Sequence, residues 1–423
     1  MTVDYPDEFF IAVKLCSTFV GLGLPSRNPN EILRIVYALY KSCLFLLAII
    51  FMICELITFR EAFGDTQMLV SQIGMMFTHV VGLLKLSILI LKRKQIELIQ
   101  RKLQNREFYY KTLGNFQPGS KMRRERYLSI FISSFIFVLY SFVGISAHIS
   151  TYLIVRKNAV DDQFIANVTC ESLLPYYYYY PFDMSTVTGC YYSLTYMDIC
   201  LDIFAWYIAT SDMLFVGSLH LLKTQLDILG EAIINIRRRC LDALGMRTSF
   251  EIFKDEWHPD LENTMYNELT HCTKHLMTLL DVRNDVEEIF TFVTLAQTIA
   301  SLLIFASCLY VAARVPMTSP NFFSQLEYFC AVLIQFSIYC WFGNQITRAS
   351  ESITSALYSA NWFGSSRRFK KSMVLTMTRM QRPLYLSIGK FTPLALSTLL
   401  GVVRGSFSYF TVFQSVGDVE QLE

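Results

Sequence analysis

Hydroxyl-bearing side chains recur in the last long apolar segment of this 423-residue chain, which runs from about residue 392 to 416. At 100° per residue on a helix, Arg404, Ser408, Thr411 and Ser415 fall within an arc of about 60°. Such a stripe could face water in a pore, where polar groups stand in for part of the hydration shell of a passing ion. It could equally bond neighbouring helices or its own backbone, as small polar side chains do in membranes. Composition alone leaves both interpretations open.

Ionisable residues also fall within or near apolar segments, where they mark functional sites by default. They are Glu55, His79, Lys85, His148, Asp198, Asp202 and Asp212. Asp198 and Asp202 are four residues apart and share one helix face, which suits an ion site or, more simply, hydrogen bonds to neighbouring helices. A transporter or a membrane acyltransferase would need buried paired charges or a catalytic His–Asp arrangement. The spacing of these residues predicts neither.

The familiar catalytic and metal-binding motifs are missing from the sequence. His, Cys, Asp and Glu show no spacing that is typical of a metal site. The sequence contains no Gly-x-Ser-x-Gly, no His-Glu-x-x-His and no phosphate-binding loop. We therefore expect a protein that is not an enzyme, that uses no cofactor, and that binds neither metal nor nucleic acid.

Membrane-spanning helices are the elements that would position these residues. Hydrophobic residues make up 53% of the chain and charged residues only 17%, against about 25% in a soluble domain. Seven segments each provide about 20 predominantly apolar residues, which is enough for a helix to cross a bilayer. These spans are roughly 38–59, 67–91, 127–154, 190–221, 289–313, 322–347 and 392–416. The predicted fold class is an all-α membrane protein with seven transmembrane helices.

Lys and Arg are concentrated in alternate connections between the spans. The connections after spans two, four and six are rich in both, whereas the others hold only Arg60, Arg156, Lys157 and Arg314. Positively charged loops stay on the cytoplasmic side of a membrane. We therefore expect the N-terminus in the cytoplasm and the C-terminus outside, in a multi-pass protein of the cell membrane.

The connection 155–189 is the long outer loop of this topology. Asn167 begins an Asn-Val-Thr sequon for glycosylation, on the side of the membrane where glycans are attached. Cys170 and Cys190 flank the loop and could form a disulfide in that oxidising compartment, although Cys190 could also simply belong to span four. The tyrosine run 176–180 suits anchoring at the outer interface better than a lid over a ligand entrance.

Two of the inner segments have a helical rather than a loop-like pattern. Apolar residues recur at three- and four-residue spacing through 222–288, which predicts cytoplasmic extensions of spans four and five joined by a loop around Lys254–Pro259. Segment 365–386 is basic, amphipathic and helical, and a stretch with Pro and Gly separates it from span seven, which predicts a broken helix. The apolar faces of these helices need protein partners, so we expect an oligomer.

Seven spans also suggest a G-protein-coupled receptor. Glu125-Arg126-Tyr127 spells the acidic-Arg-Tyr triplet of that class, but it stands at the start of span three, whereas that class has it at the end. Asn28-Pro29 precedes the first span and has no Tyr three residues later. The predicted orientation is inverted as well. This interpretation is therefore the weakest alternative.

The C-terminal third of the chain resembles the signature region of insect odorant receptors. Segments 270–297 and 339–346 are similar to the family's entry into span five and its exit from span six, and the rest of the chain is compatible with the family. The other matching features are Tyr358 with Trp362, the basic helix that follows, Gln381-Arg382-Pro383 and the closing Ser408-Tyr409-Phe410-Thr411-Val412.

The resemblance implies an odorant-tuning subunit of a ligand-gated, nonselective cation channel. Four subunits, among them a shared co-receptor, would surround one pore that passes monovalent and divalent cations. The ligand would be a small volatile odorant, and the location would be the dendrite of a sensory neuron. A gustatory-type receptor channel is the alternative, because the Thr-Tyr…Gln-Phe pattern of that related family matches Ser408-Tyr409…Gln414-Ser415 in part.

The resemblance also implies how the chain is divided. The parts differ in whether they bind ligand, anchor the assembly or line the pore. They are a cytoplasmic N-terminal segment 1–37, a ligand-binding bundle of helices one to four 38–221, cytoplasmic anchor helices 222–288, helices five and six 289–347, an anchor helix with the inner part of helix seven 348–391, the pore-lining part of helix seven 392–416 and an extracellular tail 417–423.

The family's hydrophobic gate falls on Val412 and Val416 in this chain, with Ser415 beside them and Ser408 and Thr411 along the same path. A narrow ring of valines can close a pore by dewetting. Val412 lies about 60° and Val416 about 100° from the centre of the polar stripe. The helix must therefore tilt for the valines to face the axis of the pore.

The family's odorant pocket lies in the outer halves of spans two, three, four and six. In span three its Ser-x-x-Gly-x-x-x-aromatic spacing maps onto Ser141, Gly144 and His148, where His replaces a larger ring. Such a pocket is apolar, with Met, aromatic rings and a few hydroxyls, and would bind a volatile mainly by burial. The implied residues are Ile73, Met76, Phe77, Val80, Ser141, Gly144, Ile145, His148, Tyr191, Thr195, Ile199, Phe329, Leu333 and Phe336.

Overall fold

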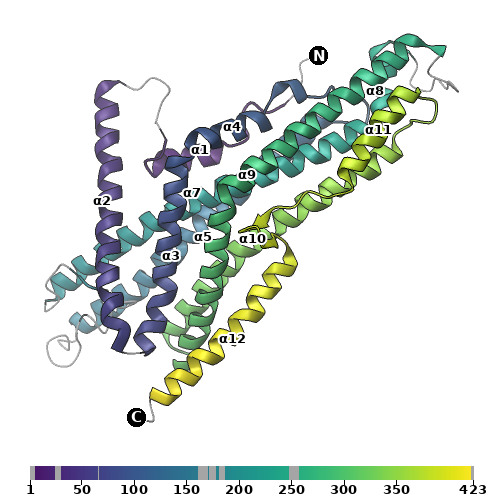
Figure 1. Ribbon diagram of the computed structural model, residues 1–423. Helices are drawn as coiled ribbons and strands as arrows, with labels where there is room; N and C mark the ends of the chain where they lie inside the picture. The colour runs from purple at the N-terminus through teal and green to yellow at the C-terminus, as the bar shows by residue number, and fades with distance from the viewer. Residues whose placement is uncertain are drawn as a thin grey trace.

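The computed structural model of the chain is almost entirely helical. It describes residues 5–23, 30–64, 66–160, 170, 178–180, 186–246 and 257–420. Within these residues seven helices are long and apolar enough to cross a membrane, so the predicted fold class is confirmed (Figure 1). They are α2 (Glu31–Glu61), α3 (Thr66–Leu91), α5 (Pro118–Val160), α7 (Val187–Ile234), α9 (Pro259–Arg314), α10 (Pro320–Ser359) and α12 (Leu396–Glu420).

Shorter elements connect the long helices, and several helices begin where the sequence offers a cap. The Ser319 hydroxyl accepts the N–H of Phe322 (3.2 Å) at the start of α10, where Pro320 occupies a position that needs no N–H. The short elements are α1 (Ile11–Phe19), η1 (Ala62–Gly64), α4 (Arg93–Leu103), η2 (Arg106–Phe108), α8 (Ile236–Ala243), α11 (Arg367–Met380), β1 (Ser387–Ile388) and β2 (Thr392–Pro393).

The helices α7, α9 and α10 are longer than a membrane span because each continues into a second bundle with α8 and α11 (upper right in Figure 1). Leu261, Leu269 and Leu276 of α9 recur every seven or eight residues and are buried in the same core as Ile353 of α10 and Phe369 of α11. The helical extensions predicted from the periodicity are therefore present. We call this second bundle, formed by α8, α11 and the adjoining ends of α7, α9 and α10, the anchor bundle.

A β-hairpin interrupts the chain between α11 and α12, where a broken helix was predicted. The strands β1 and β2 pair antiparallel, and Gly389 and Lys390 turn the chain with φ angles of 58° and 65°, a conformation that glycine adopts without strain. The N–H of Gly389 donates to the carbonyl oxygen of Thr291 (3.2 Å), and the N–H of Ser387 donates to Oε1 of Glu287 (3.0 Å). The hairpin thus fixes the start of α12 against α9.

The centre of the molecule is α7, which is buried over nearly its whole length. The helices α3, α5, α9 and α10 pack around it, while α2 and α12 lie at opposite flanks (Figure 1) and expose many apolar side chains. Apolar surface of this kind is stable in lipid or against another subunit. The arrangement therefore places a five-helix core between two peripheral helices.

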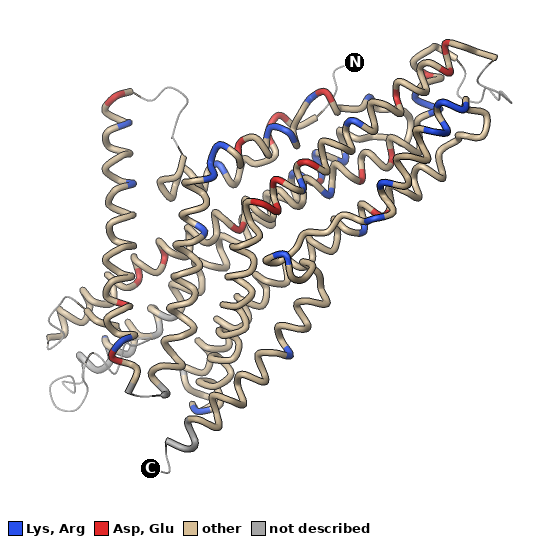
Figure 2. Tube along the Cα trace, viewed as in Figure 1, with Lys and Arg blue, Asp and Glu red and all other residues tan. Residues whose placement is uncertain are grey.

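Charge is distributed unevenly along the molecule. Figure 2 shows Lys and Arg gathered in the half that holds α4, α8 and α11, with few in the half that contains the C-terminal end of α12. The two ends of the chain lie at opposite ends of the molecule (Figure 1). This asymmetry is the one that the positive-inside rule interprets, and the orientation in the membrane stays a prediction.

The outer loop carries the one covalent cross-link within the described residues. Cys170 and Cys190 are joined by a disulfide. Of the two alternatives for Cys190, the disulfide is therefore the one that the structure has. Cys190 belongs to α7 as well, and both cysteines are buried with Leu194. Asn167 lies outside the described residues, and its glycosylation stays a prediction.

Two tyrosines of the outer loop pack inside the molecule. The ring of Tyr178 stacks on Phe51 of α2 (centroids 4.7 Å apart), and its hydroxyl donates to the carbonyl oxygen of Phe51 (3.1 Å). The Tyr180 hydroxyl contacts Sδ of Met197 on α7 (3.3 Å). The expectation that the tyrosine run anchors at the membrane interface is therefore wrong for Tyr178 and Tyr180, because their rings fill space between α2 and α7.

Candidate ligand cavity and pore helix

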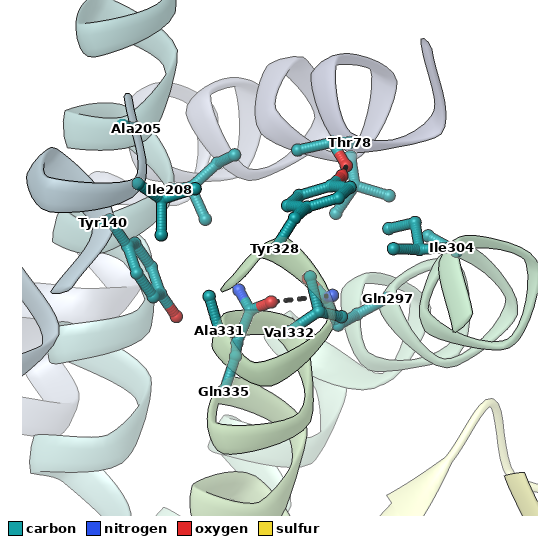
Figure 3. Close-up of a pocket in the computed structure, with 13 residues that line it drawn as sticks. Thr78, Tyr140, Ala205, Ile208, Gln297, Ile304, Tyr328, Ala331, Val332 and Gln335 are labelled. Carbon is teal, nitrogen blue, oxygen red and sulfur yellow. Dashed lines mark hydrogen bonds between the residues drawn. The ribbon is translucent and has the colours of Figure 1, made fainter. Parts of the chain in front are cut away.

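A cavity of about 100 Å³ lies where α3, α5, α7, α9 and α10 converge (Figure 3). It lies near the middle of α3, α5 and α7, and on α9 and α10 it lies in the half away from the anchor bundle. Its wall is mainly aliphatic, with a few polar side chains. The lining residues are Thr78, Val81, Tyr140, Val143, Ala205, Ile208, Gln297, Ala300, Ile304, Tyr328, Ala331, Val332 and Gln335.

The polar side chains of this wall are paired with one another or with the helices behind them. The hydroxyls of Thr78 and Tyr328 share a short hydrogen bond, and the Thr78 hydroxyl also lies 3.0 Å from the carbonyl oxygen of Gly74. On the opposite wall Nε2 of Gln297 donates to Oε1 of Gln335 (3.1 Å), the bond drawn in Figure 3. These pairs join α3 to α10 and α9 to α10 across the cavity.

A buried carboxylate behind the cavity accepts hydrogen bonds from three other helices. Asp212 of α7 accepts from Nζ of Lys85 on α3 (2.7 Å) and from the hydroxyl of Tyr140 on α5 (2.8 Å). Two residues of α10 also donate to it, Gln335 through Nε2 (2.6 Å) and Tyr339 through a short bond. Charge-assisted hydrogen bonds of this kind compensate the removal of a carboxylate from water. We call these residues and Gln297 the Asp212 network.

Lys85 completes this network. Its side chain is fully buried, and besides Asp212 it donates to Oε1 of Gln297 on α9 (2.7 Å). All five core helices therefore meet at one ion pair. Because Lys85 and Asp212 neutralise each other and no lining side chain is charged, the cavity offers no counterion to a charged ligand. Its shape and apolar wall favour a small neutral molecule.

We expected no buried pairs of charged residues in the spans, and this expectation is wrong. Lys85 and Asp212 form one buried pair, and Nδ1 of His79 lies 2.8 Å from both carboxylate oxygens of Glu55 in another. The partners are 127 and 24 residues apart, so no local spacing reveals them. A usable signal existed nonetheless, because a Lys and an Asp deep in apolar spans must find partners.

Three of the residues predicted in span three, Ser141, Gly144 and His148, face α7 instead of the cavity. The Ser141 hydroxyl accepts a hydrogen bond from Nε1 of Trp206 (3.0 Å). One turn on, Gly144 leaves room for the carboxylate of Asp202, which a Cβ at Gly144 would meet at 2.6 Å. A further turn on, Nδ1 of His148 lies 3.2 Å from Oδ1 of Asp198. The spacing that suggested a ligand wall therefore forms a helix contact. It also places Asp198 and Asp202 opposite α5. Their role, as an ion site or in hydrogen bonds between helices, stays a prediction.

Most of the other residues predicted for the pocket lie on neighbouring faces of the same helices. Val80, Ile145, Thr195 and Ile199 are exposed on the surface of the bundle. Phe336 is fully buried in the core. No residue of the predicted pocket is among those that line the cavity. Their contact with an odorant stays a prediction.

The remaining pocket residues are half-buried between helices. The ring of Phe329 packs on Phe305 of α9 (centroids 4.9 Å apart), and Leu333 adjoins the same core. The Tyr191 ring lies 5.2 Å from that of Tyr152 on α5. Ile73, Met76 and Phe77 lie on α3, where Phe77 immediately precedes the lining residue Thr78. The cavity thus lies among the helices of the predicted pocket and α9, and on α3 its lining residue Thr78 follows the predicted Phe77 by one position.

The pore residues predicted on α12 lie on the face that the chain leaves uncovered. Val412 and Val416 are about half exposed (53% and 51%). The face beside them is covered, because Val402 and Ser406 are buried and the ring of Phe413 packs near Tyr310 of α9. A valine pair on a membrane helix therefore faces lipid or other subunits.

Two hydroxyls of the polar stripe bond their own helix, and the stripe stays exposed. The Thr411 hydroxyl donates to the carbonyl oxygen of Ser408 (2.8 Å), and the Ser415 hydroxyl donates to that of Val412 (2.9 Å). Ser408, Thr411 and Ser415 are all exposed in the single chain. Each hydroxyl oxygen can still accept a further hydrogen bond. Thr411 and Ser415 thus have hydrogen-bond partners within the helix, and the stripe remains able to meet water.

Comparison with known proteins gives one consistent match. A family model described as 7tm Odorant receptor matches residues 65–407. Odorant receptor Or1 of Anopheles gambiae is 22% identical over 422 residues, which cover 98% of this chain and 96% of that receptor. Odorant receptor 2a of Drosophila melanogaster is 27% identical over 173 residues, which cover 40% of this chain and only 43% of that receptor.

The fold has a solved counterpart. The insect olfactory receptor OR5 from Machilis hrabei in complex with eugenol superposes with a TM-score of 0.72 at 16% identity, over 96% of this chain and 97% of that one. The structure of the same receptor described without eugenol gives a TM-score of 0.69 at 15% identity. At this identity the likeness concerns the arrangement of helices.

Proposed function

Because the chain belongs to the insect odorant receptor family, we propose that it is the odorant-sensing subunit of a heteromeric, ligand-gated, nonselective cation channel. The ligand is a small volatile organic molecule, and the partner is a shared co-receptor in an assembly of four subunits. The permeant ions are monovalent and divalent cations. The function implies a place in the dendritic membrane of a sensory neuron.

The uncovered face of α12 is the observation that carries the channel proposal. Val412 and Val416 expose about half of their surface, while an adjoining side of the helix is packed on α9. With one such helix from each subunit around an axis, the valines form a ring that closes by dewetting and the hydroxyls border a wet path. The polar stripe of this peripheral helix supports the same proposal, because its exposed hydroxyls remain able to meet water.

The cavity supports the ligand part of the proposal. Its polar side chains already have hydrogen-bond partners, so a ligand gains mainly from burial of apolar surface and at most a few further bonds. The related OR5 receptor was solved with eugenol, which makes eugenol a sensible first member of an odorant panel. Filling of the cavity shifts α10 and the outer part of α12 and widens the valine ring.

The uneven charge supports a cytoplasmic N-terminus and an extracellular C-terminus. The Lys- and Arg-rich half, with the anchor bundle, faces the cytoplasm (Figure 2). The end of α12 that carries Val416 then lies near the outer surface. This orientation is the reverse of that of a G-protein-coupled receptor, the alternative with seven helices.

Voltage clamp of cells that express the chain with the co-receptor tests the proposal. An odorant panel should elicit cation currents that persist in excised patches, because no soluble messenger is needed. Currents that disappear when G-protein turnover is blocked would favour the metabotropic alternative. Silence toward every odorant despite confirmed surface expression would refute the proposed role. Responses to non-volatile tastants alone would favour the gustatory alternative.

A further inference from the structure

The Asp212 network lies between the cavity and the start of the pore helix. Tyr140, Gln297 and Gln335 line the cavity and belong to the network. Lys85 and Asp212 form a second layer behind them, on the side toward the anchor bundle. Any molecule that enters the cavity therefore touches side chains whose other contacts are with a buried ion pair.

One face of α10 runs from this network to the hairpin. Gln335, Tyr339 and Gly343 follow each other at intervals of four residues and share that face. Gln335 and Tyr339 donate to Asp212. Gly343 packs so closely on Leu394 that a Cβ would collide with the Leu394 carbonyl oxygen. A displacement of this face must move the backbone of Leu394.

Leu394 is firmly connected to both the hairpin and α12. Its N–H donates to the carbonyl oxygen of Leu386 (2.7 Å), which continues the pairing of the hairpin. It stands two residues before the first residue of α12, Leu396. A helix is stiff over a few turns, so motion at Gln335 reaches the base of α12 through about two turns of α10.

We propose that the Lys85–Asp212 pair is a coupling latch, which holds α10 through Gln335 and Tyr339 and transmits occupancy of the cavity to α12. The inference rests on the proposed function, because it takes α12 as the pore helix. A ligand that pushes on Tyr140 or Gln335, or competes for their hydrogen bonds, weakens their hold on Asp212. The helix α10 then settles in a second position and carries the hairpin with it.

The use of an ion pair here is itself informative. A buried pair commonly stabilises a protein no more than apolar residues of the same volume would, whereas loss of one partner is strongly unfavourable. The free energy of such a pair therefore depends strongly on whether its hydrogen-bond donors stay in place, which can separate two positions of the helix that carries them. Coupling between distant sites requires an element with two positions that both sites influence, and α10 is bonded to the pair at one turn and packed on Leu394 at another.

Replacement of Tyr339 by Phe tests the latch without a change in the cavity wall. Tyr339 is not among the lining residues, and Y339F removes one donor to a buried charge, a change that commonly alters an equilibrium about tenfold. We expect the ratio of ligand-free to maximal current to change about tenfold at equal surface expression. The control is Y207F, because Tyr207 is buried in the separate apolar cluster with Phe51 and Phe204. That variant should leave the ratio unchanged.

Replacement of Gly343 by Ala tests the second step independently. G343A forces Leu394 away from α10 and should shift the same current ratio, again without a change at the cavity. The control is G230A on α7, where an added Cβ meets Ile353 at an ordinary distance of 3.7 Å. Either variant decides the question alone if the other fails to reach the cell surface.

The outcomes separate the latch from the proposed function. An altered current ratio in Y339F and G343A, with both controls unchanged, supports the latch. Unaltered ratios in both variants at normal surface expression overturn it, even if the natural chain responds to odorants. A natural chain without any odorant-gated current counts against the proposed function. Ligand-free currents of the same cells still report on the latch in that case.

Discussion

Ala331 is a position from which the cavity can be filled by a larger side chain. It is buried on α10 and lines the cavity, and replacement by Leu adds three carbon atoms that point into the empty space. At about 24 cal/mol per Å³, a void of about 100 Å³ corresponds to about 2.4 kcal/mol. A free energy of about 2.4 kcal/mol is about 50-fold in a binding constant.

A331L should therefore raise the odorant concentration for half-maximal current by up to about 50-fold, because the leucine already occupies the volume that the ligand would fill. The assay is the concentration–response curve under voltage clamp, with co-receptor present and surface expression measured in the same cells. Thermal unfolding of the purified protein provides a second readout. The melting temperature should not fall, since the added carbons replace a void and not packed atoms.

The matched control is the adjacent residue. Cys330 precedes Ala331 on the same helix but is exposed on its outer face, so C330L adds bulk at the same depth without entering the cavity. We expect its curve to coincide with that of the natural chain. If A331L responds like the natural chain at equal surface expression, this cavity is not the odorant site and the reasoning from its volume is refuted.

Three further changes test other parts of the molecule. V412T places a hydroxyl in the proposed ring and should raise the ligand-free current several-fold by making the constriction easier to wet, and an unchanged current would count against a hydrophobic gate. Loss of the disulfide, which closes a loop with a sequence separation of 20, should lower the free energy of unfolding by about 3 kcal/mol. C170S, C190S and the double variant should lose the same amount in denaturant titrations, and unequal losses would contradict this account. Burial raises the pKa of the Cys240 thiol in the anchor bundle to about 12. Stability should therefore fall as pH rises above about 9, where only the unfolded chain releases the proton, and C240A should flatten that part of the pH dependence in thermal unfolding.

The membrane helices could be predicted because lipid imposes a strong and local requirement on sequence. A span needs about 20 apolar residues wherever it occurs, and the seven segments found in this way correspond to α2, α3, α5, α7, α9, α10 and α12. The helical extensions followed from a local periodicity, and the break before α12 followed from proline and glycine. Each of these features depends on residues that are near one another in the sequence.

The contacts between helices could not be predicted in the same way. Asp212 and Lys85 are 127 residues apart, and the rotation of each helix about its axis decides whether they meet. A rotation by one residue, 100°, is enough to exchange Phe77 for Thr78 as a wall of the cavity. The burial of Tyr178 depends on Phe51 of α2, which no pattern within the tyrosine run indicates. The rotation of α12 about its axis could be predicted, because the polar stripe itself marks one face of the helix.

The energy that a ligand gains in the cavity limits how far it can open the channel. A ligand shifts an equilibrium only by its difference in affinity for the two states. If all of the roughly 2.4 kcal/mol from the filled cavity favoured the open state, a closed-to-open ratio of about 100 to 1 would become about 2 to 1. A single occupied subunit of this kind therefore opens a channel fully only if the resting equilibrium is already close to balance or if another interaction changes with occupancy. The Asp212 network provides such an interaction, because Tyr140 and Gln335 contact both the cavity and the buried carboxylate. Burial would then select the ligand by shape, while the ion pair behind the wall would determine how far a bound ligand shifts α12 toward the open position.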